Sequence, residues 1–249
     1  MKNDKNVKKH ILQTGENSIV YTVSRTGRKT IGITINEKGD VKVSAPLFIS
    51  EKEIIEVVRK KAAWITEKLN ELKKRNLNTA AREYVSGEKL LYLGSEYTLK
   101  VVEKEQYKPI VFMQDDNIIV YIPRGLPEES RKQVIKDSLV KWYKQCFNDI
   151  ACKRVKKYSY NLMIISCRIV IKDQKTRWGS CSSKGNINLN WRLVMAPLYI
   201  IDYVIVHELC HMRFMNHSKD FWNLVESIIP NYRECRRWLR ENGYNLKID

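Results

Sequence analysis

The 249-residue sequence predicts an α+β fold, with a β-rich N-terminal part followed by a mainly helical part that contains a short sheet. Apolar and polar residues alternate in short runs as far as Ile122, which is typical of strands with one buried face. After Glu128 the apolar residues recur mostly at spacings of three and four, as in amphipathic helices. Apolar residues make up 43% of the chain, which suffices for the core of one large domain or two small ones.

The β-rich part is predicted between residues 18 and 125, after a polar segment, 1–17, that we expect to be flexible. Three short alternating runs separated by turn residues predict a β-meander. Its strands are Ile19–Val23, Ile31–Ile35 and Val41–Ala45. Ser50 and Glu53 then form a capping-box pattern, and apolar residues at helical spacing predict one long helix as far as Leu72.

A second group of alternating runs follows this helix. The predicted strands are Leu90–Leu93, Tyr97–Val102, Ile110–Phe112 and Ile118–Ile122. Residues 114–117 favour a hairpin turn between the last two. Pro123, Gly125 and Pro127 interrupt the pattern, so we place a domain boundary there and predict a second domain at 126–249. No convincing internal repeat is present, although the order sheet, helix, sheet, helix hints at one.

The second domain is predicted to begin with a helix between Glu128 and Tyr160. A strand at Cys167–Ile171, a polar loop at Lys175–Lys184 and an alternating strand at Ile187–Leu193 follow. The apolar run Tyr199–Val206 then predicts a buried helix.

Three of the four histidines lie within eleven positions of one another, in His207-Glu208-Leu209-Cys210-His211 and at His217. Residues i and i+4 of a helix project from one face, so His207 and His211 can bind one metal ion. The Glu208 carboxylate is turned about 100° from His207 and can accept the proton of a water that the metal activates. This pattern predicts a zinc hydrolase site with Glu208 as general base. Cys210 is expected to pack, because a fourth protein ligand would close the position of the water.

The third ligand is predicted from the chain that follows. A catalytic zinc ion takes three protein ligands and leaves one position open. His217 can return to the metal if the chain turns near Asn216 and a second helix follows, which the apolar spacing after residue 220 supports. Glu226, on that second helix, is the rival ligand. We favour His217, because imidazole suits zinc and little else would concentrate histidine here.

Short motifs between residues 176 and 222 carry a family resemblance. They are Thr176-Arg177-Trp178-Gly179-Ser180-Cys181-Ser182, Asn188-Leu189-Asn190-Trp191-Arg192-Leu193, Asp202-Tyr203-Val204, His207–His211 and Asn216-His217-Ser218 with Phe221-Trp222. The chain resembles the YgjP-like metal-dependent hydrolases, distant relatives of the SprT-like and WLM zinc proteases, from about residue 20 onward. The resemblance implies a zincin-like catalytic domain with His207, His211 and His217 as ligands and Glu208 as the catalytic residue. It implies much less about the substrate.

Arg177, Ser180 and Asn190 are the candidate substrate-binding residues. Arg177 can stabilise the negative charge that develops on an attacked carbonyl or phosphoryl group, or else brace Asp202 or its own loop. Ser180 is a candidate substrate contact but has no histidine left to act as its base. Asn190 lies on the hydrogen-bonding face of Ile187–Leu193, which is either an edge strand that accepts a peptide or an inner strand.

The net charge of +17 favours nucleic acid, nucleotides or acidic peptides as partners, or reflects only a lysine-rich composition. No recognisable nucleic-acid-binding module accompanies it. The chain starts with charged residues and lacks a run of ~18 apolar residues, so we expect a cytoplasmic protein without a membrane span.

We therefore predict a zinc-dependent hydrolase, most simply a metallopeptidase, in which another divalent ion such as Mn²⁺ could replace zinc. A metal-dependent nucleotide hydrolase is the alternative that the charge and Arg177 would suit. A non-enzymatic, zinc-containing nucleic-acid-binding module is a third reading, but it would leave Glu208 without a task.

Overall fold

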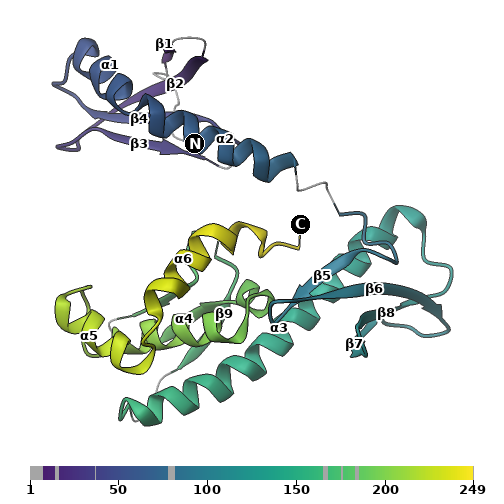
Figure 1. Cartoon of the computed structure of the whole chain (residues 1–249). Coiled ribbons are helices and arrows are strands. Elements are labelled where there is room, and N and C mark those ends of the chain that lie inside the picture. Colours follow the sequence, from purple (N-terminus) through teal and green to yellow (C-terminus); the bar gives the residue numbers. More distant parts are fainter. Residues whose placement is uncertain are drawn as a thin grey trace. The chain divides into compact units, whose positions relative to one another are not determined.

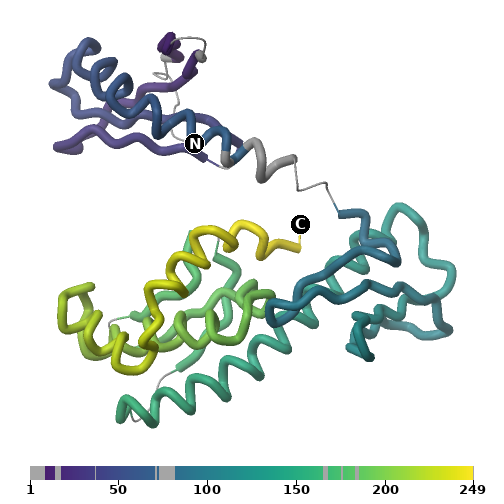
Figure 2. The backbone as a smooth tube through the Cα atoms, in the orientation of Figure 1, coloured from purple at the N-terminus to yellow at the C-terminus, as the bar shows by residue number. Residues whose placement is uncertain are grey.

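The computed structural model describes residues 8–14, 17–36, 38–77, 82–164, 168–174, 176–182 and 185–248 (Figure 2). The chain divides into two compact units, Met1–Ala81 and Arg82–Asp249. The predicted boundary near residue 125 differs from this division. Pro123 and Gly125 mark only a turn, because the strands before them share one core with the helices after them. The predicted α+β class is confirmed.

The first unit contains one sheet, with strand order β1-β2-β4-β3 (Figure 1). Its strands are β1 (Lys8–Thr14), β2 (Asn17–Thr26), β3 (Gly32–Ile35) and β4 (Val41–Pro46). The prediction of a flexible segment as far as residue 17 was wrong for β1, which pairs antiparallel with β2. Leu12 is buried while Ile11 is 68% exposed, so β1 has the two-faced pattern of a strand despite its charge.

The predicted β-meander was also wrong. Strand β4 pairs in parallel with β2, and β3 pairs antiparallel with β4 at the edge. Val41 and Val43 of β4 are buried, whereas Ile33 and Ile35 of β3 are only half-buried. The more apolar strand thus takes the central position, where both of its neighbours protect it from water.

Two helices, α1 (Glu51–Lys60) and α2 (Ala62–Leu77), follow the sheet. The predicted capping box is present, because the Ser50 hydroxyl accepts from the Glu53 N–H and Glu53 accepts from the Ser50 N–H. The predicted single helix is interrupted at Lys61. Apolar residues of both helices bury against the sheet in one core.

The second unit begins with a sheet of the same topology as the first. Its strands are β5 (Lys89–Tyr92), β6 (Ser95–Lys104), β7 (Ile110–Gln114) and β8 (Asn117–Pro123). The order is β5-β6-β8-β7, with β6 and β8 parallel and the outer pairs antiparallel, as in the first sheet. A helix follows in each case. The structure therefore contains a repeated sheet-and-helix topology that the sequence pattern only hinted at.

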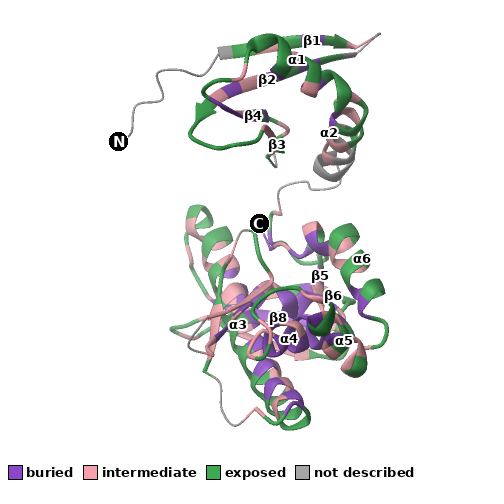
Figure 3. Ribbon diagram, turned by 90° about the vertical axis from the view of Figure 1, so that its left-hand side faces the viewer, coloured by how far each residue is buried: buried purple, intermediate pink, exposed green. Residues whose placement is uncertain are grey.

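Helix α3 (Glu128–Asn161) covers one face of this sheet and connects it to the rest of the unit. Its buried residues recur at four-residue spacing and form one stripe: Ile135, Leu139, Tyr143, Phe147, Ala151 and Val155. Figure 3 shows buried residues concentrated on this side of α3 and in the helix α4 (Leu198–Cys210) that packs against it. Within the described residues, no helix has both the length and the apolar character that a membrane span requires.

A third, small sheet lies beside α4. Its strands are β9 (Ile169–Lys172), β10 (Gly179–Cys181) and β11 (Ile187–Asn190), in the order β10-β11-β9. The predicted polar loop therefore contains a strand, β10. The predicted strand Ile187–Leu193 ends at Asn190 and continues as a 3-10 helix, η1 (Trp191–Met195). Helices α5 (Lys219–Ile228) and α6 (Tyr232–Asn242) complete the unit.

Candidate metal centre and active site

Helix α4 holds His207, and His211 is its C-cap residue. The helix is buried almost all round, which is expected of a helix that is apolar on every side. The buried residues Ile201, Ile205 and Leu209 lie four apart on one face and anchor the helix in the core. His207 and Glu208 therefore project from a rigid last turn.

The loop after α4 returns the third histidine to the first two. Helix α4 ends at Cys210, and the hydroxyl of Ser218, the N-cap of α5, accepts from the N–H of Phe221. His207, His211 and His217 each contribute a ligand atom to a cluster in which all these atoms lie within 4.8 Å of one another. The predicted turn is thus present. Cys210 is buried outside this cluster, and burial raises the pKa of its thiol to about 12.

The chemistry of these donors fits a divalent ion. Nε2 of His207 and Nε2 of His217 are 3.1 Å apart, close to the ~3.3 Å separation of two nitrogens that bind zinc at tetrahedral angles. Nδ1 of His211 lies 3.1 Å from the carbonyl oxygen of Phe214, which orients the ring so that Nε2 can bind a metal. Burial lowers the pKa of His207 to about 3, and His211 and His217 add to the effect, so its imidazole is neutral, as a ligand must be.

Glu208 lies beside this cluster and is buried. Burial raises the pKa of its carboxyl to about 7, and the positive charge of Arg177 opposes the rise. Gly179 of β10 approaches the Glu208 side chain so closely that a Cβ atom on it would lie 2.6 Å from Oε1. A larger residue at position 179 would therefore displace the carboxylate or the strand.

The candidate substrate-binding residues differ in what they contact. Asn190 is buried, donates to the carbonyl oxygens of Gln174 and Arg177, and accepts from the N–H of Arg192. Its side chain therefore braces the loop before β10, and these contacts already occupy its amide. Ser180 is half-buried on β10, and its hydroxyl accepts from the Asn188 amide.

Arg177 is exposed, and it does not brace Asp202. That carboxylate pairs with Arg154 of α3.

Strand β11 is the inner strand of its sheet, so it is not the edge that could accept a peptide. Among the described strands, β10 is the edge on the side of Glu208.

An aromatic group beside the histidines was not predicted from the sequence. The indole of Trp222 stacks on the His217 ring, with centroids 5.5 Å apart and an interplanar angle of 19°. Tyr232 stacks on Trp222 at 5.0 Å, and the Arg236 guanidinium lies 4.6 Å from the indole centroid. Burial lowers the pKa of His217, and His211 and Arg236 add to this effect. The one feature of the sequence that could have indicated this group is the i, i+4 spacing of Tyr232 and Arg236, which places both side chains on one face of a helix.

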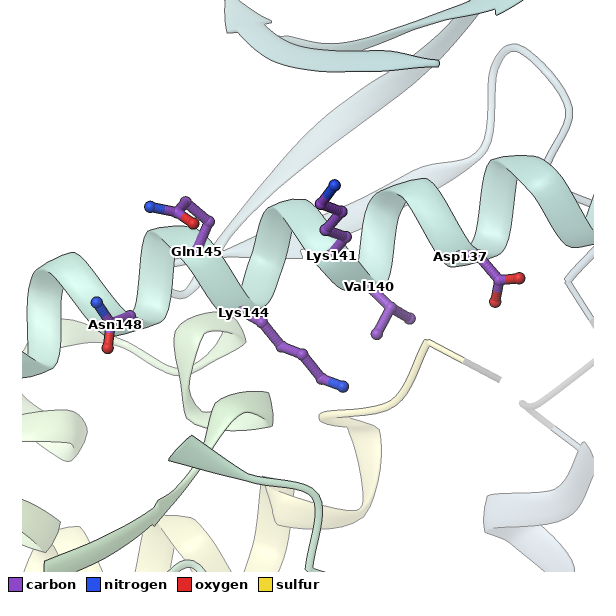
Figure 4. A pocket seen from close by; sticks show the side chains of 6 residues that line it. All are labelled: Asp137, Val140, Lys141, Lys144, Gln145 and Asn148. Atoms are coloured by element: carbon purple, nitrogen blue, oxygen red, sulfur yellow. The ribbon is translucent and has the colours of Figure 1, made fainter. Parts of the chain in front are cut away.

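Two surface hollows lie outside the histidine cluster. One, of about 390 Å³, runs along the exposed side of α3 and is lined by side chains from its successive turns, among them Asp137, Lys141 and Lys144 (Figure 4). The other, of about 330 Å³, is lined by Tyr199 of α4 and by residues of α6 and the turn before it, including Arg237. Neither contains a residue of the candidate site.

Comparison with known proteins identifies the family. The model of the YgjP-like metallopeptidase domain matches residues 29–242. The chain belongs to the YgjP-like metallopeptidase family. A crystal structure of the metallopeptidase zymogen of Pyrococcus abyssi abylysin is similar at 21% identity with a TM-score of 0.34, covering 36% of this chain and 93% of that one. No curated protein matches.

Membership of this family makes the chain a metal-dependent peptidase that acts on peptide substrates. The resemblance noted in the sequence is confirmed, and the family implies a divalent metal ion. Nothing in the comparisons supports the nucleotide or nucleic-acid partners that the charge had suggested.

Proposed function

We propose that this YgjP-like protein is a zinc-dependent peptidase in which His207, His211 and His217 hold the ion and Glu208 is the general base. The observation that carries the proposal is the convergence of three imidazoles, with ligand atoms within 4.8 Å of one another, beside a buried carboxylate. Three histidine ligands suit zinc better than Mn²⁺, which prefers oxygen ligands. When bound, zinc polarises the scissile carbonyl and lowers the pKa of water.

Glu208 moves the proton in this proposal. Its carboxylate accepts a proton from the attacking water and then delivers the proton to the leaving nitrogen. Burial suits this task, because a desolvated carboxylate holds a proton more readily than an exposed one. Gly179 and the core residues of α4 keep the carboxylate in place, so the proton donor and acceptor stay within hydrogen-bonding reach.

Strand β10 is proposed to bind the peptide backbone. Its one described partner is β11, so its other edge can pair with an extended peptide. Because Gly179 lies against Glu208, a peptide paired there would pass close to the carboxylate. Arg177, whose charge acts on Glu208, is proposed to stabilise the oxyanion that forms on the attacked carbonyl.

The test compares two substrate panels on zinc-reconstituted protein. One panel contains unstructured peptides, and the other contains nucleoside triphosphates, the substrates of the alternative hydrolase. We expect the protein to hydrolyse peptides. EDTA should abolish this activity and added zinc should restore it, whereas the Glu208→Gln variant should be inactive. Hydrolysis of triphosphates without cleavage of peptides would contradict the proposal. Activity on neither panel, together with tight nucleic-acid binding, would favour the non-enzymatic module.

A further inference from the structure

Arg236 is an exposed cation held beside the histidine cluster. Its guanidinium lies over the indole of Trp222, 4.6 Å from the ring centroid. The same indole stacks on His217 and has its centroid 5.7 Å from that of His207. One aromatic ring therefore contacts both Arg236 and the candidate metal ligands. The attraction between a cation and an aromatic face favours one position of this long side chain.

Unlike Arg154, Arg192 and Arg233, Arg236 has no carboxylate partner among the described residues. Arg233, on the same helix, pairs with Glu226 at 2.8 Å, and Arg192 pairs with Asp173 at 3.0 Å. Arg154 pairs with Asp202. In the part of the chain that the structure describes, no carboxylate forms an ion pair with Arg236, which is exposed. Its donors are therefore available to an anion from outside the chain.

We propose that Arg236 recognises a carboxylate of the peptide substrate and so sets a preference for acidic groups near the scissile bond. The inference rests on the proposed peptidase function. A guanidinium can bind a carboxylate through two parallel hydrogen bonds, and a side chain already fixed on an indole loses little entropy when it does so. The carboxylate belongs either to an acidic side chain or to the C-terminus of a short peptide.

The distance limits where this carboxylate lies. An extended peptide advances about 3.3 Å per residue. Arg236 lies 4.6 Å and the His217 ring 5.5 Å from the centroid of the same indole, so Arg236 can reach a group two or three residues from the scissile bond, but not a distant part of the substrate. The preference should accordingly depend on position within the peptide.

Two sets of matched peptides test the proposal on zinc-loaded, full-length protein. The peptides of the first set have an amidated C-terminus and form pairs that differ only by Glu against Gln, placed in turn at each of three positions on either side of the cleaved bond. The peptides of the second set have uncharged side chains and differ only by a free against an amidated C-terminus. The measured quantity is the ratio of kcat/KM for the carboxylate peptide to that for its amide. We expect a ratio above 1 in one of the two sets, which identifies the source of the carboxylate.

Arg236→Gln should reduce that ratio roughly 10- to 100-fold, as expected for the loss of a hydrogen bond between charged groups. Arg236→Lys should restore only part of it, since an ammonium group cannot form the paired hydrogen bonds. Arg237→Gln is the matched control, because Arg237 lies next along α6 and lines the separate hollow beside Glu234 and Glu241. This control should keep the ratio.

A merely structural role for Arg236 makes a different prediction. Loss of packing on Trp222 would lower kcat/KM for both members of each pair equally and leave the ratio unchanged, which would overturn the proposal. A wild-type ratio of 1 throughout both sets would overturn it too. The dissociation constants of the same peptides, measured by calorimetry on Glu208→Gln with and without Arg236→Gln, give a readout that needs no turnover. If the wild type cleaves no peptide while Arg236 still selects the carboxylate in binding, the peptidase mechanism fails and the recognition role stands.

Discussion

Gly179→Ala should damage the active site through a single added methyl group. Built on the present backbone, the new Cβ would lie 2.6 Å from Oε1, 2.7 Å from Cγ and 2.9 Å from Cδ of Glu208. The optimal separation of two non-bonded heavy atoms is at least about 3.5 Å. The strand or the carboxylate must therefore move by about 1 Å. Gly179 does not have a positive φ, so alanine adds no backbone strain and the effect is steric.

The expected losses follow from that displacement. Inserting a methyl group into a packed interior costs roughly 1–3 kcal/mol of the free energy of unfolding. A catalytic group displaced by about 1 Å loses on the order of 10²-fold in turnover. Urea denaturation of Gly179→Ala gives the first quantity, and peptide hydrolysis by the folded, zinc-loaded variant gives the second.

Gly94→Ala is the control for destabilisation alone. Its Cβ would lie 2.7 Å from Cγ of Pro197, and φ is +85°, so this variant should lose stability as well. It does not contact Glu208, so turnover per folded molecule should stay near that of the wild type. Wild-type turnover and stability in Gly179→Ala would refute the close contact between β10 and the base.

Three further predictions concern the ligand set, the core and the first unit. His217→Ala should lose most of its bound metal after dialysis, whereas Glu226→Gln should retain it, because Glu226 pairs with Arg233; the reverse result would make Glu226 the third ligand. Asp202→Asn should lower the free energy of unfolding by about 3 kcal/mol, because Arg154 is then left with an uncompensated charge in a site where the paired side chains are only 23% and 10% exposed. A loss under about 0.5 kcal/mol in urea would show that this pair is solvated. Ser50→Ala should destabilise the first unit by about 1 kcal/mol in thermal unfolding and leave turnover unchanged, and no shift would mean that the cap contributes nothing.

The local features of this fold could be predicted from the sequence because they depend on neighbouring residues. Alternation located the strands β2 to β8, and the four-residue spacing of histidines on a helix placed His207 and His211 on one face. The order of the strands could not be predicted, since the parallel pairing of β2 with β4 depends on which strand is the more deeply buried. Strand β10 has only three residues, too few to show a period.

The candidate site likewise contains some features that could be predicted from the sequence and others that depend on how distant segments pack. His217 could be assigned from the need for a third ligand, and its return to the cluster needed only a turn and a cap. The contact of Arg236 with Trp222 depends instead on how α5 and α6 pack together, and the sequence shows only a run of arginines on a helix. Asn190 looked like a substrate contact because it is polar on a strand, but its amide is needed to hold the loop before β10.

The Glu208→Gln variant tests the central claim most directly. Glutamine has the size of glutamate and can form hydrogen bonds, but it cannot accept the proton of water. We predict that zinc content per chain and melting temperature stay at wild-type values or above, while peptide turnover falls at least ~10²-fold. Wild-type turnover would exclude Glu208 as the general base. Loss of zinc would show instead that Glu208 is a metal ligand or a structural carboxylate.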